Sequence, residues 1–204
     1  MKVLDGFRHL PGHLDGTAQR RLLKSILAAI DDAPLFTPTM PRTGKPMSVR
    51  MSNCGPLGWV TDKERGYRYQ PLHPSTGRPW PAIPDALLAL WIDVCGAGVQ
   101  PEACLINWYS ADAKLGLHRD EDEQDCTAPV LSVSLGADAR FVIGGLARRD
   151  AKQRIVLRSG DVVVLGGQSR LAYHGVERIL PAPNGLMGDG ERLNLTLRRV
   201  SRPG

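Results

Sequence analysis

The sequence predicts a mainly β fold with flanking helices, in which a double-sheet jelly roll carries an N-terminal helical and aromatic segment. Three observations predict it. Two helical patterns fall within residues 1–98, aromatic residues stand among glycines and prolines between them, and short strand-like runs fill residues 99–204. Short strands closed by glycine or turn residues are typical of a sandwich or barrel.

Size and composition favour one compact unit. The chain has 204 residues, 42% of them hydrophobic, which is enough for one domain with a sizeable core. Its formal charge of +5 permits a polyanionic partner without requiring one. The N-terminus has no apolar segment of the signal-peptide type, and no window is apolar enough to span a bilayer. We expect a cytoplasmic protein with no membrane partner.

The first predicted helix covers residues 15–31. Its leucines and isoleucines recur at spacings of three and four, which places them on one face. Asp15 or Thr17 could cap its N-terminus. Residues 33–47 follow with four prolines and a glycine, which exclude a helix and favour a loop or an edge.

The segment from residue 53 to 81 mixes glycine and proline with large aromatic side chains, among them Trp59 and Trp80. It is not a linker, because such side chains are costly to leave in solvent. A second helix is predicted from Pro84, a residue that suits a first helical turn. Its apolar stripe consists of Leu87, Leu88, Trp91, Ile92 and Cys95.

Seven strands are predicted after Gly98. Each run is β-branched or alternates between apolar and polar residues. The runs are "EACLINWYS", "PVLSVSLG", "ARFVIGG", "QRIVLRSG", "DVVVLGG", "RLAYHGV" and "RLNLTLRRV". The four cysteines, Cys54, Cys95, Cys104 and Cys126, match neither a zinc site nor a disulfide framework, so we expect reduced thiols that mostly fill the core.

A candidate metal site starts from His118 and Asp120. At this spacing on an extended segment both side chains point to the same side. His174, predicted at the end of a strand, could supply a third ligand, and two histidines with one carboxylate are the ligand set of non-haem Fe(II) oxygenases. The alternative is a solvated acidic loop and an ordinary strand-end histidine, because short motifs of this kind recur freely.

Residues 192–198, "RLNLTLR", alternate throughout, with leucines on one face and polar residues on the other. A half-buried strand with its polar face in water explains the pattern. The two arginines also form a potential clamp for a carboxylate, since arginine pairs with it bidentately and stays charged when buried. Asn107 and Tyr109 share one face of their own segment and could add an amide and a phenol, although ordinary core packing would also explain Tyr109.

Together these residues resemble the AlkB family of Fe(II)/2-oxoglutarate dioxygenases. The resemblance rests on HxD at His118, the distant His174 and R-x-N-x-T-x-R from Arg192, and it extends over roughly residues 47–200 through "NWYSADAKLGLHRDEDE", "GDVVVLGGQSRLAYHGV", "MSVRMSNCGPLGWVTD" and "GYRYQP". It implies a double-stranded β-helix core over residues 99–204 and a nucleotide-recognition lid within residues 1–98. Leu197 departs from the family, where an aromatic is common, and the loop 181–190 has no counterpart that we can assign.

The resemblance also implies cofactors and the residues that hold them. Fe(II) would be bound by His118, Asp120 and His174, with 2-oxoglutarate and O2 as co-substrates. Arg192 would hold the distal carboxylate of 2-oxoglutarate, and Arg198 would lie near its iron-chelating end. The full set implied for 2-oxoglutarate is Asn107, Tyr109, Arg192, Asn194 and Arg198.

The activity implied is oxidative dealkylation of N-alkylated bases, a direct reversal of DNA damage that releases the alkyl group as an aldehyde. The substrate would be single- or double-stranded DNA, with RNA as an open alternative, and the enzyme a monomer. The implied substrate contacts are Trp59, Tyr67, Arg68, Tyr69, Asp122 and Arg148. For Trp59, stacking on an extruded base competes with core packing. The remaining acids of the run, Glu121, Glu123 and Asp125, are expected to be solvated.

Nine basic residues are candidates for nonspecific phosphate contacts, and we expect about half of them to be ordinary surface charges. They are Lys63, Arg65, Arg68, Arg140, Arg148, Arg149, Lys152, Arg154 and Arg158. Two other functions stay open: an oxygenase that acts on a protein or a small molecule, and a nucleic-acid-binding module without catalysis. The preferred lesion and the DNA or RNA preference are not predictable from these residues.

Overall fold

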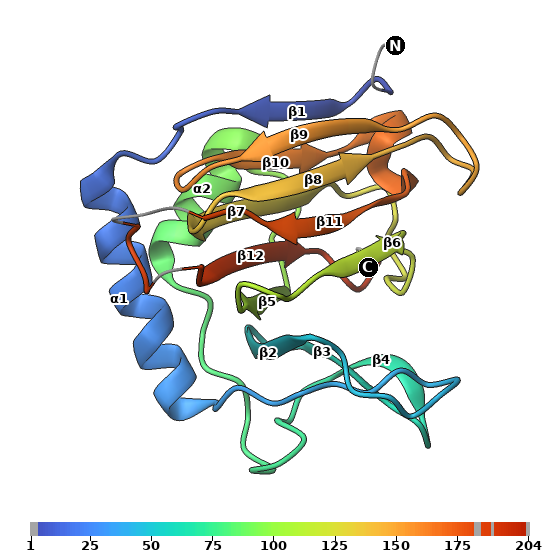
Figure 1. Cartoon of the computed structure of the whole chain (residues 1–204). Coiled ribbons are helices and arrows are strands. Elements are labelled where there is room, and N and C mark those ends of the chain that lie inside the picture. The colour runs from blue at the N-terminus through green and yellow to red at the C-terminus, as the bar shows by residue number, and fades with distance from the viewer. Residues whose placement is uncertain (1–3, 182–184, 189, 203–204) are drawn as a thin grey trace.

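The computed structural model describes residues 4–181, 185–188 and 190–202, and it contains two β-sheets packed face to face (Figure 1). Part of the loop 181–190 therefore lies outside the described residues. The larger sheet has six strands in the order β1-β10-β7-β12-β5-β2, and the smaller has four in the order β6-β11-β8-β9. The predicted jelly roll of short antiparallel strands is confirmed.

The strands of the larger sheet are β1 (Phe7–Leu10), β2 (Val49–Cys54), β5 (Ala103–Tyr109), β7 (Val130–Gly136), β10 (Val162–Leu165) and β12 (Arg192–Arg198). Those of the smaller sheet are β6 (Leu115–His118), β8 (Ala139–Ile143), β9 (Gln153–Leu157) and β11 (His174–Ile179). Every pair within the two sheets is antiparallel, as β12 with both β5 and β7.

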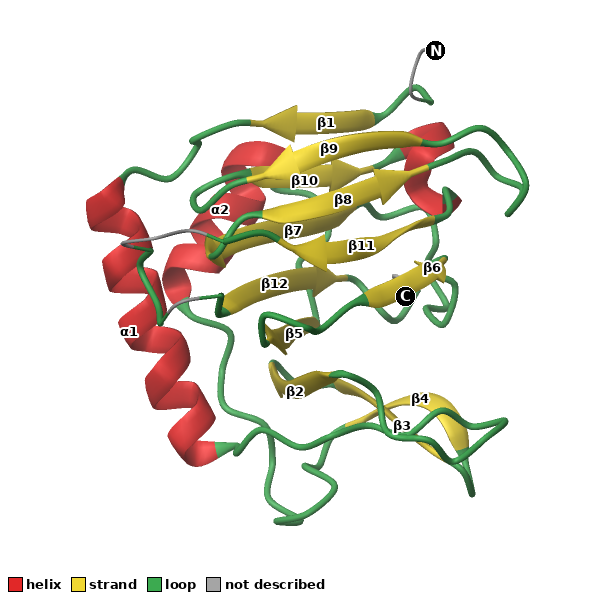
Figure 2. Cartoon of the chain, viewed as in Figure 1, coloured by secondary structure: helices red, strands yellow, loops and turns green. Residues whose placement is uncertain are grey.

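Two helices cover the outer face of the larger sheet (Figure 2). Helix α1 (Gly16–Asp32) starts at Asp15, whose carboxylate accepts a hydrogen bond from the amide of Ala18 at 2.8 Å. Helix α2 (Asp85–Cys95) follows Pro84. Their apolar faces pack against the leucines of β12, so the leucine face of that strand points outward to the helices and its polar face points between the sheets.

A two-stranded hairpin, β3 (Gly58–Asp62) and β4 (Gly66–Gln70), lies at one end of the sandwich below β2 in Figure 1. Its register places Trp59 opposite Tyr69 and Thr61 opposite Tyr67. The aromatic segment is therefore ordered, as its composition predicts.

The two parts of the sequence share one sheet. Strand β1 pairs with β10, and β2 pairs with β5, so strands from residues 1–98 complete the sheet formed by residues 99–204. The division at residue 98 stays a prediction, while the pairing makes the two parts continuous. No helix in the described part of the chain is both long and apolar enough to cross a bilayer.

One strand prediction was wrong. His174 does not end a strand; it begins β11, and the residues before it form a 3-10 helix, Gly167–Leu171. Gly167 has a φ of +50°, a conformation suited to glycine, and the Ser169 hydroxyl bonds back to Gly166. This local turn competes with strand formation and delivers His174 to the start of β11.

Candidate active site

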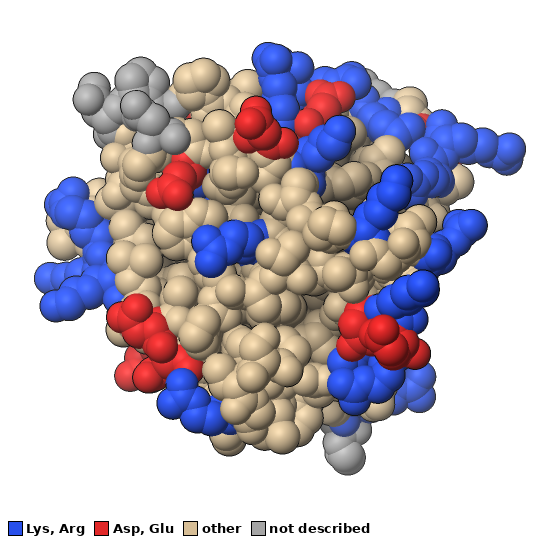
Figure 3. Space-filling view, turned by 60° about the horizontal axis from the view of Figure 1, so that its bottom comes forward, with Lys and Arg blue, Asp and Glu red and all other residues tan. Residues whose placement is uncertain are grey.

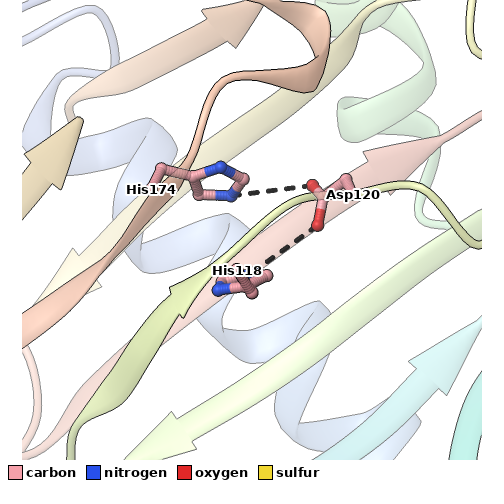
Figure 4. Close-up of side chains that lie close together, drawn as sticks. All are labelled: His118, Asp120 and His174. Atoms are coloured by element: carbon pink, nitrogen blue, oxygen red, sulfur yellow. Dashed lines mark ion pairs between the residues drawn. The ribbon is translucent and has the colours of Figure 1, made fainter. Parts of the chain in front are cut away.

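The ends of β6 and β11 bring the two predicted histidine ligands together. His118 is the last residue of β6 and lies directly opposite His174 in the register, with ring centroids 4.5 Å apart. Asp120 follows β6 by two residues, just beyond the strand, and its carboxylate lies beside the two rings with one oxygen toward each (Figure 4). Its oxygens are 3.6 Å from His118 Nε2 and 3.8 Å from His174 Nε2.

Backbone carbonyls fix the tautomer of both histidines. The Nδ1 atom of His118 lies 2.9 Å from the carbonyl of Gly116, and that of His174 lies 3.0 Å from the carbonyl of Ala172. A carbonyl only accepts hydrogen bonds, so each Nδ1 carries the proton and each Nε2 keeps its lone pair. Both lone pairs face Asp120, which is the orientation that metal-binding histidines take.

Electrostatics keep the site in the metal-binding protonation state. Burial alone would raise the pKa of Asp120, but the charge of Arg198 and the neighbouring imidazoles outweigh it and hold that pKa well below its usual range. Burial, followed by the influence of His118, lowers the pKa of His174 to about 4. At neutral pH Asp120 is therefore ionised and His174 neutral.

The three side chains fit a divalent metal ion. Their ligand atoms all lie within 4.8 Å of one another. The Oδ2 atom of Asp120 is buried and accepts no hydrogen bond from the described residues, which is costly for a charged oxygen unless a cation takes that place. Two neutral imidazoles and one carboxylate leave open positions for other ligands.

The polar face of β12 is buried, so the alternative of a strand face in water was wrong. Arg192 and Arg198 are 0% and 6% exposed. In the register Arg192 lies opposite Tyr109 and Asn194 lies opposite Asn107, so the residues predicted to hold 2-oxoglutarate form one continuous patch. Arg198 continues this face toward Asp120.

Arg192 is a buried cation that forms no ion pair with a carboxylate of the described residues. Its guanidinium donates to the carbonyl of Ala137 at 3.0 Å and to the hydroxyl of Ser134 at 2.7 Å, and its Nε atom has no partner among the described residues. Burial lowers its pKa to about 10. A buried guanidinium that bonds only neutral oxygens is arranged to receive an anion.

Arg198 has the opposite surroundings. It donates to Asp120 Oδ1 at 2.7 Å and to Glu123 Oε1 at 3.0 Å. Burial alone would lower its pKa, but the charges of these carboxylates, with the Tyr69 hydroxyl, outweigh burial and raise it. The positive charge of Arg198 is therefore already matched.

Polar groups line the patch between the two arginines. Asn107 donates to Asn194 Oδ1 at 3.4 Å, while its own Oδ1 is buried without a partner among the described residues. Tyr109 is buried, and burial raises its pKa, so the phenol stays protonated. Tyr109 lies opposite Arg192 in the register, and its pKa also responds to the charges of both Arg192 and Asp120.

The hairpin places Trp59 next to Asp122. The indole Nε1 donates to Asp122 Oδ2 at 2.8 Å, and the Trp59 ring stacks on Tyr67 with centroids 5.6 Å apart. Trp59 is only 8% exposed, whereas Tyr67 is 52% exposed. The burial supports core packing for Trp59, and base stacking by this residue stays a prediction.

The other predicted substrate residues lie in different surroundings. Arg68 forms an ion pair with Asp62 at 2.6 Å. Tyr69 donates its hydroxyl to Glu123 and accepts from Arg198 at 3.0 Å, so it belongs to the buried network. Arg148 is exposed and lies over the edge of the candidate site, where it donates to the carbonyl of Leu117 at 2.8 Å.

Two residues of the acidic run are not solvated as expected. Glu123 is buried and pairs with Arg170 as well as Arg198, at 3.1 Å and 3.0 Å. Asp125 is also buried and accepts hydrogen bonds from Thr127, which lower its pKa. The prediction of solvated side chains was wrong for both, because each carboxylate has donors of its own, while Glu121 is exposed as expected.

The sequence reasoning missed Arg170 and Glu123. Arg170 donates to the backbone carbonyl of Asp120 at 2.6 Å and to that of Ala128 at 2.8 Å, so it fixes the loop that carries the metal-site carboxylate. Its position four residues before His174 was a signal in the sequence that Arg170 lies near the candidate metal site. A buried charge cannot, however, be distinguished from an exposed one by composition.

The nine candidate basic residues divide into two groups. Ion pairs with nearby carboxylates engage Arg68, Arg140, Arg154 and Arg158. The other five form no ion pair that the described residues reveal. Figure 3 shows Lys and Arg gathered along the right-hand side of the face that includes the hairpin end of the molecule. Phosphate contacts by these side chains stay a prediction.

Comparisons with known proteins agree with this geometry. The family model of the 2OG-Fe(II) oxygenase superfamily matches residues 6–198. The chain is 50% identical over 200 residues to the alpha-ketoglutarate-dependent dioxygenase AlkB homolog of Caulobacter vibrioides (strain NA1000 / CB15N), covering 98% of this chain and 90% of the relative. It is 44% identical over 189 residues to the alpha-ketoglutarate-dependent dioxygenase AlkB of Escherichia coli (strain K12), covering 91% and 86%.

A solved structure, that of OsALKBH1, superposes with a TM-score of 0.81 at 30% identity and covers 98% of this chain and 100% of that one. The match over nearly the whole chain confirms the resemblance that the motifs indicate. The chain therefore belongs to the 2OG-Fe(II) oxygenase superfamily and, within it, to the AlkB family of dioxygenases.

Proposed function

We propose that this chain catalyses the oxidative dealkylation of N-alkylated bases in nucleic acid, with Fe(II), 2-oxoglutarate and O2. DNA, single- or double-stranded, is the proposed substrate and RNA the alternative. The AlkB dioxygenases of Caulobacter vibrioides and Escherichia coli, 50% and 44% identical, support this activity. The observation that carries the enzymatic part is the buried polar face of β12, which has Arg192 at one end and, at the other, Arg198 bonded to Asp120 of the three-residue candidate metal site.

In this proposal His118, Asp120 and His174 hold Fe(II). When bound, Fe(II), 2-oxoglutarate and O2 together oxidise the alkyl carbon next to the base nitrogen, forming succinate and CO2, and the hydroxylated group leaves as an aldehyde. The lone pairs on the two Nε2 atoms and the free Oδ2 of Asp120 are the donor atoms that the chain supplies.

Arg192 is proposed to bind the distal carboxylate of 2-oxoglutarate. Ser134 and the carbonyl of Ala137 hold the guanidinium in place, and a carboxylate would satisfy its remaining donors. Asn107, Tyr109 and Asn194 line the space toward the metal site. Arg198 orients Asp120 from the opposite end, and we retain its proposed place near the metal-chelating end of 2-oxoglutarate.

The substrate side is proposed to include the hairpin and the edge near β6. Asp122, held by Trp59, would face the base, and the exposed Tyr67 offers an aromatic surface. Partial burial raises the pKa of Asp122, and its carboxylate, which accepts from Trp59, offers acceptor oxygens to the edge of a base. Arg68, Tyr69 and Arg148 complete the proposed set.

Turnover of 2-oxoglutarate with and without a methylated oligonucleotide tests the proposal. Stimulation by the oligonucleotide, with loss of turnover in His118→Ala, is the expected result. Parental turnover in that variant would disprove the metal assignment. Equal turnover with and without oligonucleotide would favour the second candidate, an oxygenase acting on a protein or small molecule, and matched DNA and RNA oligonucleotides separate the two nucleic acids.

We also propose that the enzyme works as a monomer in the cytoplasm, with residues 1–98 contributing the lid and residues 99–204 the catalytic core. The four free cysteines are consistent with a reducing compartment. Sedimentation of the purified chain would test the monomer, since a dimer mass at micromolar concentration would contradict it.

A further inference from the structure

Four charged side chains form a buried network behind the candidate metal site. Asp120 and Glu123 supply two carboxylates, and Arg170 and Arg198 supply two guanidiniums. All four residues are at most 6% exposed. The two charges of each sign balance, so the network as a whole is neutral.

Glu123 is the hub of this network. Its Oε1 atom accepts from Arg198 at 3.0 Å and its Oε2 atom accepts from Arg170 at 3.1 Å. Each arginine then reaches Asp120 by a different route: Arg198 through the side-chain oxygen Oδ1 and Arg170 through the backbone carbonyl. Both the carboxylate and the main chain of Asp120 are therefore held by groups that Glu123 positions.

The hairpin is joined to the same hub. The Tyr69 hydroxyl, from β4, donates to Glu123 and accepts from Arg198 at 3.0 Å. Burial is the main cause that raises the pKa of Tyr69, so the hydroxyl keeps the proton that it donates. One tyrosine thus links the hairpin to the groups that orient Asp120.

We propose that Glu123 is a positioning residue that sets the orientation of the Asp120 carboxylate toward the metal and couples it, through Tyr69, to the hairpin. With Glu123 present, Arg198 is shared between two carboxylates, and Oδ2 of Asp120 is left free to face the imidazoles. Without its charge, two guanidiniums oppose one carboxylate beside a cation site. This inference rests on the proposed metal role of the triad.

The coupling has a functional consequence. Nucleic acid that contacts the hairpin would act on Tyr69. Tyr69 reaches the carboxylate of Asp120 in two hydrogen-bonding steps through Arg198, or in three through Glu123 and then Arg198. Substrate occupancy and metal geometry are therefore linked through Tyr69, Glu123 and Arg198, none of which is a proposed metal ligand.

The affinity for Co(II), measured by calorimetry in the absence of 2-oxoglutarate and oligonucleotide, tests the positioning role. Glu123→Gln keeps the shape and removes the charge, and we expect Co(II) affinity to fall about 10–100-fold, as for other groups that orient metal ligands. Glu123→Asp restores the charge and should recover part of the affinity. Glu121→Gln, on the exposed acid two residues earlier, is the matched control and should bind as the parent does.

A Glu123→Gln protein with the parental circular dichroism spectrum and parental Co(II) affinity would overturn the proposal. If Glu123→Gln does not fold, Tyr69→Phe carries the test. Tyr69→Phe should weaken Co(II) binding several-fold and speed hydrogen exchange of the β3–β4 amides, and an unchanged Co(II) affinity would overturn the coupling.

A double variant separates coupling from independent damage. If Tyr69 acts through Glu123, Tyr69→Phe should cost little further Co(II) affinity in the Glu123→Gln background, and additive losses would contradict the coupling. Failure of the proposed function looks different. In that case parent and His118→Ala bind Co(II) equally, whatever stands at position 123.

Discussion

Arg192 and Arg198 lie at the two ends of the seven-residue strand β12, on the same face and both buried. Arg198 is surrounded by carboxylates, and their charges raise its pKa. Among the described residues Arg192 bonds a hydroxyl and a carbonyl and no carboxylate, and burial lowers its pKa to about 10. One strand thus carries a matched and an unmatched buried charge.

Under the proposed function, the difference separates an arginine that the protein's own carboxylates neutralise from one that is open to a ligand carboxylate. A buried charge costs free energy unless it is paired, so the chain gains stability from Arg198 and loses some by burying Arg192. A protein can retain such a loss of stability at a site where the anion of a bound ligand pairs with the buried charge. The two ends of β12 should therefore respond in opposite ways to the same substitution.

The largest expected effect is on folding stability, at the end of β12 where carboxylates pair with Arg198. We call this end the matched end and the end at Arg192 the unmatched end. Arg198→Met removes the guanidinium that bonds the buried carboxylate of Asp120 and leaves Glu123 with Arg170 alone of its two arginines, and it should lower the free energy of unfolding by about 3–5 kcal/mol. Urea denaturation of the metal-free protein measures it. A loss below about 1 kcal/mol, the level of a surface pair, would mean that these carboxylates are not held by Arg198.

The next effect concerns the ligand at the unmatched end. Arg192→Ala should weaken 2-oxoglutarate binding by about 2–5 kcal/mol, because the bound carboxylate loses its charged partner. Calorimetry with the Co(II) form measures this, and Arg149→Ala, on an exposed arginine, is the control. An unchanged affinity would place the carboxylate partner at Arg198 or elsewhere.

The metal site beside the matched end predicts a pH dependence. His174 has a pKa of about 4 when folded and an ordinary value of 6.5, so between these pH values the unfolded chain binds a proton that the folded chain does not. The free energy of unfolding of the metal-free protein should therefore fall as pH falls through this window, by about 3 kcal/mol at its lower end. His174→Gln should show a smaller fall. Identical pH profiles for parent and variant would contradict the assignment.

The smallest effects are expected at the hairpin, beyond the matched end. Tyr67→Ala removes a half-exposed ring and should weaken binding of methylated oligonucleotide by about 1–3 kcal/mol, with the melting temperature unchanged. Trp59→Ala should lower the melting temperature, since the ring is buried. If Trp59→Ala instead keeps the parental melting temperature and loses oligonucleotide binding, Trp59 is the stacking residue.

Much of this could be predicted from local patterns. The alternation of residues 192–198 and the glycine-closed runs predict strands because side-chain direction in a strand is set by neighbours in sequence. The metal triad was found because two of its members are two residues apart. The structure brings its third member, His174, next to the other two, although the predicted place of His174 in its strand was wrong.

Which buried carboxylates and guanidiniums pair with one another could not be predicted from the sequence. Glu123 stands in a run of five acids whose composition is that of a solvated loop, and only the fold brings Arg170 and Arg198 to it. The same holds for Trp59, which shares a buried cluster with Leu105 and Tyr109 and donates to Asp122, all far from it in the sequence. The burial and the partners of these residues depend on contacts between segments far apart in the chain. Local patterns in a single sequence do not predict such contacts.

The most direct test of the contrast between the two arginines is the melting temperature of Arg192→Met, measured with and without saturating 2-oxoglutarate in the Co(II) form. We predict that this variant is at least as stable as the parent without 2-oxoglutarate and gains little when it is added, whereas the parent gains stability by ligand binding. A variant that is clearly less stable without 2-oxoglutarate, or that gains as much as the parent with it, would contradict an unmatched Arg192 reserved for the ligand.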